Sequence, residues 1–132
     1  MTREPELQQF WADSKVYERL AVDNPGEPFV LHDGPPYANG DLHIGHALNK
    51  ILKDFINRNQ LLEGKRAAFV PGWDTHGLPI ELKVLQSMKS KERASLTPLE
   101  LRKKAAGFAQ ETMAKQRSSF KRYGVWGFWD EP

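Results

Sequence analysis

The segment from residue 34 to residue 40 constrains the fold more than any other part of the chain. Its sequence is Gly34-Pro35-Pro36-Tyr37-Ala38-Asn39-Gly40. Two prolines remove two backbone N–H donors and two glycines permit tight turns, so the segment cannot be regular helix or strand. The apolar run before it, residues 29–31, predicts a buried strand because aromatic and branched residues favour strands.

A long helix is predicted after this turn. Apolar residues recur at helical spacing on one side, at Ile44, Leu48, Ile51, Leu52, Phe55 and Ile56. Polar residues occupy the other side, at Lys50, Lys53, Asn57 and Arg58. Gly64 is placed to end the helix, and residues 67–70 predict a second strand that Pro71 and Gly72 interrupt. Strand, helix and strand in this order form a right-handed βαβ unit, which predicts an α/β fold with parallel strands and flanking helices.

The rest of the chain predicts three more helices and an aromatic tail. Apolar residues between positions 5 and 20 have near-helical spacing, and the turn at 23–26 ends that helix. A short helix is expected over residues 80–88. Thr97 and Glu100 form a capping-box pattern around Pro98, so a helix should run from there to about Tyr123. Nothing after the tail at 125–129 could cover its rings, so we expect an uncovered apolar cluster.

The composition excludes several classes of protein. The 132 residues are 39% apolar and 27% charged, which is ordinary for one globular domain. The net charge of +2 tolerates a polyanionic partner but is far from that of a dedicated nucleic-acid binder. The chain has no cysteine, so thiolate metal sites are excluded. No apolar run approaches the ~18 residues of a membrane helix, and the first residues resemble neither a secretory signal nor a transit peptide.

The four histidines, His32, His43, His46 and His76, fall at predicted strand ends, loops or a helix start. His43 and His46 bracket the start of the long helix, where free N–H groups and a partial positive charge favour an anion such as phosphate. Gly45 between them has no side chain to obstruct a flat ring lying on the backbone. Two other interpretations stay open, a metal site or simple capping of the helix, and the lack of cysteine weakens the first.

A second candidate segment, residues 71–81, follows the second predicted strand. Ligands of doubly wound sheets bind beyond the carboxyl ends of the strands, so both segments should lie at one edge. Asp74 could bind a ligand ammonium group through a charge-assisted hydrogen bond of ~1.5–3 kcal/mol if water is excluded. Alternatively, Asp74 caps the following helix. Trp73 is expected to be a core ring.

The two segments together resemble a known family. Residues 43–46, His-Ile-Gly-His, match the HIGH motif of class I aminoacyl-tRNA synthetases, and residues 36–40 also look like methionine–tRNA ligases. Residues 32–35 and 72–81 resemble the isoleucine–tRNA ligases instead. Valine enzymes are expected to differ at residues 37–39 and after Trp73, and leucine enzymes at Thr75 and His76. The resemblance extends from Phe10 to Gly127.

The resemblance implies a fold and an activity. Residues 1–27 would form an N-terminal helix and turn, and residues 28–132 the first half of a Rossmann-like catalytic domain, ending where an editing insertion begins. The family activates isoleucine with ATP and Mg²⁺, giving isoleucyl adenylate and pyrophosphate, and transfers the acyl group to tRNA(Ile). A monomeric enzyme of the cytoplasm is expected, or of a plastid or mitochondrion if an import segment lies upstream.

The resemblance also implies roles for individual residues. His43 and His46 would be catalytic and would contact the ATP phosphates. The whole ATP-binding set would be Pro36, Tyr37, Ala38, Asn39, Gly40, His43, Gly45 and His46. The amino-acid-binding set would be Gly34, Pro35, Asp74 and His76. No protein-bound metal is expected in this segment.

The family pattern continues beyond what this sequence contains. The later Lys-Met-Ser-Lys-Ser loop, the second half of the sheet and the editing domain have no counterpart in the 132 residues. We therefore expect the chain alone to bind ATP weakly and not to form adenylate. The alternatives are a non-catalytic module that binds nucleotide or tRNA, half of a split ligase, and a methionine-type enzyme.

Overall fold

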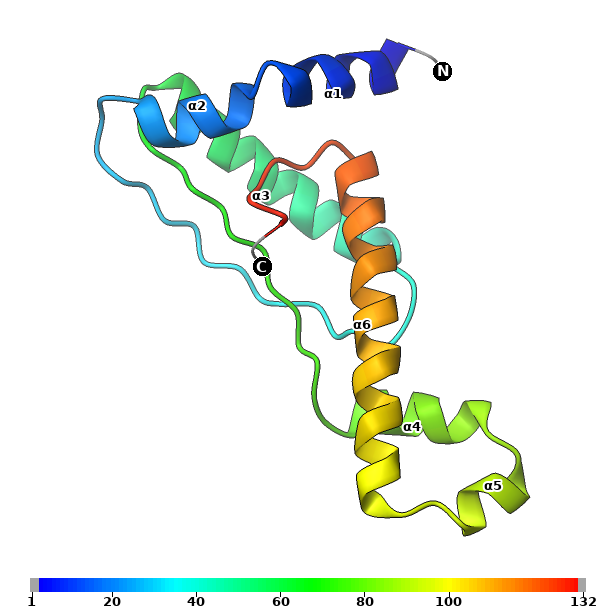
Figure 1. Cartoon of the computed structure of the whole chain (residues 1–132). Helices are drawn as coiled ribbons and strands as arrows, with labels where there is room; N and C mark the ends of the chain where they lie inside the picture. Colours follow the sequence, from blue (N-terminus) through cyan, green and yellow to red (C-terminus); the bar gives the residue numbers. More distant parts are fainter. Residues whose placement is uncertain (1–2, 131–132) are drawn as a thin grey trace.

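The computed structural model describes residues 3–130, and helices dominate this part of the chain (Figure 1). In chain order they are α1 (Arg3–Asp13), α2 (Val16–Asp23), α3 (Ile44–Leu62), α4 (Leu78–Ser87), α5 (Ser90–Ala94) and α6 (Pro98–Arg122). The helices predicted after Gly40, near residues 80–88 and from Pro98 onward are confirmed. Gly64, with a φ of +85°, follows the end of α3 as expected. The short helix α5 was not predicted.

The single helix predicted over residues 5–20 is wrong, because the chain breaks into α1 and α2. Lys15 separates them in the left-handed conformation, with a φ of 50°. The apolar spacing on either side of this residue is compatible with helix, so periodicity alone did not reveal the break. The break lets Trp11 and Tyr17 approach the ring of Trp126 from two directions, with centroids at 5.5 and 5.9 Å.

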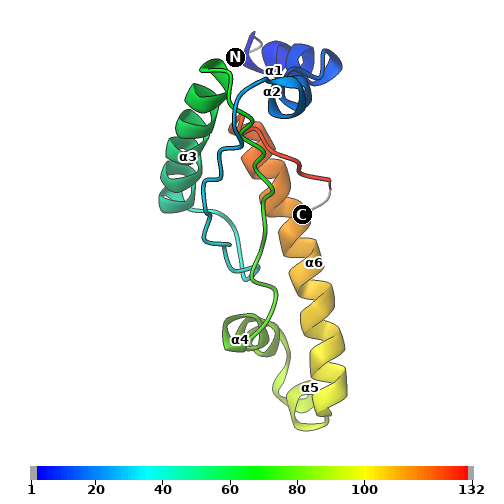
Figure 2. The ribbon, with the colours of Figure 1, turned by 90° about the vertical axis from the view of Figure 1, so that its left-hand side faces the viewer.

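The strands predicted at residues 29–31 and 67–70 do not form within the described residues. The chain on either side of α3 is instead extended. The first extended segment (residues 24–43) and the second (residues 63–77) run side by side between α3 and α6 (Figures 1 and 2). They pair in parallel at two isolated bridges, Pro28 with Arg66 and Tyr37 with Asp74. Val30, predicted to be buried, is 83% exposed. Prolines along both segments lack the N–H groups that a continuous ladder needs, and two strands alone are marginal in water.

Helix α3 turns its polar side toward the rest of the chain. An amphipathic helix normally buries its apolar side. Here the buried residues are Ala47, Lys50, Asp54, Asn57 and Leu61. Five exposed apolar residues, called the α3 apolar stripe below, are Ile44, Leu48, Leu52, Phe55 and Ile56, and Leu62 at the end of the helix is exposed too. The two sides predicted from the sequence exist except at Ile51, which was predicted on the apolar side but packs against the core. The stripe itself faces away from the chain's own core.

Three clusters of buried side chains form the core. Around Tyr17, Leu61 and Ala67, one cluster joins α2 to the second extended segment. A second cluster contains Phe69, Phe120, Val125 and Trp129, and a third contains Ala38, Ile80 and Ala109. The expectation that the aromatic tail is uncovered is therefore wrong. The tail folds back on α6 and the second extended segment, and Phe128 N–H donates to the carbonyl of Phe69 at 2.9 Å.

The hydroxyl of Tyr17 fixes α2 to the second extended segment. It accepts a hydrogen bond from Phe69 N–H at 2.7 Å and donates to the carbonyl of Ala67 at 3.3 Å. Burial raises the pKa of Tyr17 to about 12, although the Phe69 N–H partly opposes this. The phenol therefore stays protonated at neutral pH and can make both bonds.

Candidate functional site

The two candidate segments, residues 32–46 and residues 71–81, meet through their backbones. Ala38 N–H donates to the carbonyl of Asp74 at 2.9 Å, and Asp74 N–H donates to the carbonyl of Pro36 at 2.9 Å. The turn after the first extended segment is thus fixed against the turn after the second. This is the juxtaposition expected from the sequence, achieved by one bridge at Tyr37 and Asp74 rather than by a sheet edge. Ala38 is fully buried, so this pairing is shielded from water.

The histidine pair forms the N-terminal cap of α3. Gly45 N–H donates to Nδ1 of His43 at 3.1 Å, and His43 N–H donates to Nδ1 of His46 at 3.2 Å. The two rings lie with centroids 3.9 Å apart. An imidazole nitrogen that accepts carries no proton, so in the neutral rings the proton sits on Nε2. Capping therefore leaves two Nε2–H donors beside the positive end of a helix, which suits an anion.

The surroundings of His46 favour the neutral ring. Partial burial lowers the pKa of His46, and the neighbouring His43 and Lys50 lower it further. At Gly45, a Cβ atom would lie 2.9 Å from Cε1 and 3.0 Å from Nδ1 of His43. The glycine thus makes room for the capping ring, a reason different from the open backbone expected from the sequence.

A buried ionic network joins the first candidate segment to α3, and it was not predicted from the sequence. Asp33 accepts from Lys50 and, at 2.7 Å, from Lys53, which also donates to the carbonyl of His32 at 3.2 Å. The side chain of Lys50 is 4% exposed and that of Asp33 is 8% exposed. Burial lowers the pKa of Lys50, and the bond to Asp33 opposes this. Lys50 lies on the same side of α3 as His46, a helical i, i+4 relation that could have suggested a link.

The remaining predicted residues lie on the exposed side of this junction. Oδ1 of Asp74 accepts from the backbone N–H of His76 at 3.2 Å, while its second carboxylate oxygen takes no part in this turn. Gly77 is the N-cap of α4, so the alternative that Asp74 caps that helix is wrong. Gly34, Pro35 and His76 are exposed, and Asn39 and Gly40 are half-buried. The structure brings the segments together but shows no direct contact between His43 or His46 and Asp74.

One residue of α6 contacts both candidate segments and was also missed. Gln116 Nε2 donates to the carbonyls of Tyr37 and Gly40, at 3.1 and 2.7 Å. Its Oε1 accepts from the indole N–H of Trp73 at 2.9 Å. Trp73 is therefore a partly buried ring, as expected, but also a polar link. In the sequence Gln116 is one of many polar residues of a long helix, and no local pattern marks it.

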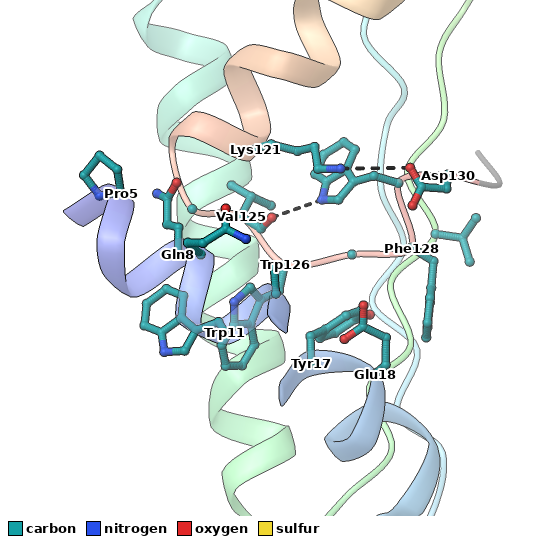
Figure 3. A pocket seen from close by; sticks show the side chains of 16 residues that line it. Pro5, Gln8, Trp11, Tyr17, Glu18, Lys121, Val125, Trp126, Phe128 and Asp130 are labelled. Carbon is teal, nitrogen blue, oxygen red and sulfur yellow. Dashed lines mark hydrogen bonds and ion pairs between the residues drawn. The ribbon is translucent and has the colours of Figure 1, made fainter. Parts of the chain in front are cut away.

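A cavity of about 950 Å³ lies elsewhere, between α1, α2 and the tail (Figure 3). The residues around it include Trp11, Tyr17, Trp126 and Phe128, and none of the predicted site residues is among them. Its charged side chains are Glu18, Lys121 and Asp130, and Lys121 lies 3.9 Å from Asp130. With two carboxylates against one ammonium group, this cavity does not suit a phosphate.

Two other kinds of functional element are absent from the described residues. In residues 3–130, no three His, Asp or Glu side chains are grouped so that they could hold a metal ion. No helix in that range combines the length and the apolar character needed to cross a bilayer.

Known proteins provide an independent comparison. Residues 6–132 match the family model for class I tRNA synthetases (I, L, M and V). Isoleucine–tRNA ligases from Cyanothece sp. and Nostoc punctiforme are each 68% identical over 98% of this chain, and that of Gloeobacter violaceus is 65% identical over 99%. The chain spans only 13–14% of the length of these relatives.

A solved structure has a similar fold. The ternary complex LeuRS–tRNA–LeuAMS of Agrobacterium radiobacter superposes with a TM-score of 0.74 at 27% identity, over 98% of this chain and 14% of that one. The family match covers the two candidate segments and nearly all of the described residues. The chain therefore belongs to the class I tRNA synthetases that include the isoleucine, leucine, methionine and valine enzymes, and it is 65–68% identical to the isoleucine–tRNA ligases above.

Proposed function

We propose that this chain supplies the histidine half of the adenylate-forming site of an isoleucine–tRNA ligase. In that enzyme ATP and isoleucine give isoleucyl adenylate, from which tRNA(Ile) takes the acyl group. The observation that carries the proposal is the backbone junction of Ala38 and Asp74. It joins the turn that leads to the helix-start anion site to the turn that carries the Asp74 carboxylate, which supports a ligand with both phosphates and an ammonium group. The identity of the relatives supports isoleucine as the amino acid.

On the ATP side, we assign the phosphates to the first turn of α3. Nε2–H of His43 and of His46 would donate to phosphate oxygens, aided by the positive end of the helix. The adenosine would lie along Gly45 and the turn of residues 36–40. Mg²⁺ would arrive with ATP as part of the substrate and would be held by phosphate oxygens. As donors to the charge that develops on phosphate, His43 and His46 are the catalytic residues of the proposal.

On the amino-acid side, we assign the ammonium group to Asp74. The carboxylate oxygen outside the His76 turn would accept its N–H. Gly34 and Pro35 would line the pocket with backbone, and His76 would border it. The substrate carboxylate would then attack the α-phosphorus, forming a carbon–oxygen–phosphorus linkage while the bond to the bridging oxygen of pyrophosphate breaks. The substrate is its own nucleophile, so positioning and charge stabilisation suffice.

The site is open to solvent, which bears on what the 132 residues can do alone. His43, Gly45 and His76 are exposed, and Tyr37 is half-exposed. Electrostatic stabilisation is much weaker in water than in a closed site. We therefore propose that turnover needs the longer polypeptide that the relatives represent. We expect that polypeptide to fold as a Rossmann-like domain and to be monomeric and cytoplasmic. The isolated chain would bind ATP weakly.

Amino-acid-dependent exchange of pyrophosphate into ATP tests the proposal. The polypeptide that carries these residues in the cell should exchange with isoleucine and far less with methionine, leucine or valine. Valine is smaller than isoleucine by one methylene, and binding alone lets this class of enzyme reject it by only about 150-fold. Robust exchange with methionine and none with isoleucine would overturn the substrate, and no exchange with any amino acid would favour a non-catalytic module. Exchange by the isolated chain would refute the need for the longer polypeptide.

A further inference from the structure

The side chain of Gln116 is the feature of the fold that the proposed function leaves unused. It comes from the C-terminal half of α6, yet all its hydrogen-bond partners among the described residues lie in the two candidate segments. The residue is 2% exposed. A buried amide without partners is costly, and a buried amide with every group bonded fixes its neighbours.

The partners determine which way the amide points. Carbonyl oxygens only accept and an indole N–H only donates. Nε2 must therefore face Tyr37 and Gly40, and Oε1 must face Trp73. Both amide hydrogens and one oxygen lone pair are used, so the arrangement has one orientation only.

Each partner belongs to one of the two segments that the proposed function uses. Tyr37 precedes the Ala38 amide that bonds Asp74, and Trp73 precedes Asp74 itself. Gly40 lies three residues before His43, the cap of α3. One amide thus connects the turn that enters the histidine cap with the turn that carries the carboxylate. The aromatic ring of Trp73 also packs on Trp129, at 6.2 Å between centroids, so this link is anchored in the core.

We propose that Gln116 is a positioning residue that holds the two substrate-binding segments in register for adenylate formation. It touches no substrate and acts through the main chain of residues 37–40 and the indole of Trp73. The inference rests on the proposed function for its link to ATP and isoleucine. The geometric part, that Gln116 restrains the junction, stands without it.

Hydrogen exchange in the 132-residue chain tests the geometric part. Gln116→Met keeps the unbranched shape but removes all three hydrogen bonds, and Gln110→Met, at an exposed position of the same helix, is the matched control. We expect the amides of Ala38 and Asp74 to exchange roughly tenfold faster in Q116M while those in the middle of α3 do not change. The control should match the parent. Unchanged exchange at Ala38 and Asp74, or equal acceleration throughout the chain, would overturn the inference.

A second variant covers the case in which Q116M does not fold. Trp73→Phe removes the indole N–H and part of the ring volume but keeps an aromatic ring against Trp129. It should speed exchange at Asp74 by a smaller factor than Q116M would, because Gln116 keeps its bonds to Tyr37 and Gly40. No change at Asp74 in W73F would contradict the restraint through Trp73.

Kinetics in the longer polypeptide test the link to function. A positioning role predicts that Q116M raises KM for both ATP and isoleucine, roughly tenfold, since both segments lose their register. A merely structural role would lower kcat through loss of folded enzyme and leave both KM values unchanged, and that result would overturn the inference. If the parent polypeptide shows no exchange activity, the proposed function fails, whereas hydrogen exchange still decides the restraint.

Discussion

Ala38 donates its backbone N–H to the carbonyl of Asp74 at 2.9 Å, across 36 positions of sequence that include the whole of α3. This bond and its partner from Asp74 to Pro36 join the two segments on which the proposed site depends. Other parts of the fold support the junction. Gln116 holds both segments from α6, and Asp33 is tied to two lysines of α3.

The ionic network under the first segment should be essential for stability. Asp33→Asn leaves Lys50 buried without its carboxylate partner, and breaking a buried pair in this way costs about 3–5 kcal/mol. Chemical denaturation should show this loss as a lower midpoint with the same slope. Asp23→Asn, at an exposed carboxylate, should change the free energy of unfolding by less than about 0.5 kcal/mol. Equal effects of the two variants would contradict the assignment.

The lack of a side chain at Gly45 should matter for the position of the capping His43 ring rather than for the stability of α3. Gly45→Ala places a Cβ against the ring of His43, so the cap loses about 1 kcal/mol, which the better helix propensity of alanine roughly offsets. Stability should therefore change little while ATP affinity falls about tenfold, the effect of losing one charge-assisted donor. Calorimetry and ATP titration would measure the two effects.

Gly107 provides the matched control for Gly45. It lies within α6, and a Cβ there meets no atom within 4 Å. Gly107→Ala should stabilise the chain by about 0.5–1 kcal/mol and leave ATP affinity unchanged. If G45A binds ATP as the parent does, the histidine cap is not the phosphate site.

The lowered pKa of His46 predicts how stability depends on pH. His46 holds its proton less tightly in the folded state than in the unfolded state, where its pKa has the ordinary value of 6.5. Below pH 6.5 the unfolded state therefore binds more protons, and the contribution of His46 to stability falls as the pH is lowered. His46→Gln should flatten this part of the curve measured by urea denaturation between pH 7.5 and pH 5. A curve that keeps its full slope in H46Q would assign the effect to another group.

The α3 apolar stripe should make the isolated chain associate. Exposed apolar patches of this kind mark interaction surfaces or aggregation sites. Sedimentation velocity should show association that increases with concentration, and Leu48→Glu with Leu52→Glu should suppress it. Leu99→Glu, at an exposed leucine of α6, is the control and should not. A monomeric parent at all concentrations would contradict the expectation.

Local signals in the sequence predicted the elements whose causes are local. The capping box of Thr97 and Glu100 starts α6, where Glu100 N–H donates to Oγ1 of Thr97 at 3.3 Å and Thr97 N–H donates to the Glu100 carboxylate at 2.8 Å. Gly64 ends α3 for the conformational reason expected. The histidines at the start of α3 and the turn at residues 34–40 were also placed correctly. The roles of these site residues remain predictions.

Features that depend on distant contacts could not be predicted in this way. Lys50 was assigned to the polar side of α3, yet this side is buried there, and Asp33 and the rings of Phe69 and Phe120 lie around its ammonium group. The aromatic tail was expected to be uncovered, because α6 and the second extended segment, which cover it, are remote in sequence. The strands were predicted from the strand propensity of their residues, but a strand also needs a paired neighbour, and the two extended segments pair only at two points.

An ATP titration followed by NMR at the histidine side chains measures whether nucleotide binds at the cap of α3. If the α3 cap binds the phosphates, ATP should shift the Nε2 signals of His43 and His46 together with the backbone amides of Ala38 and Asp74. The indole N–H of Trp126, beside the separate cavity between α1, α2 and the tail, should not move. Shifts at Trp126 with none at the two histidines would show that nucleotide binds elsewhere and would contradict the account.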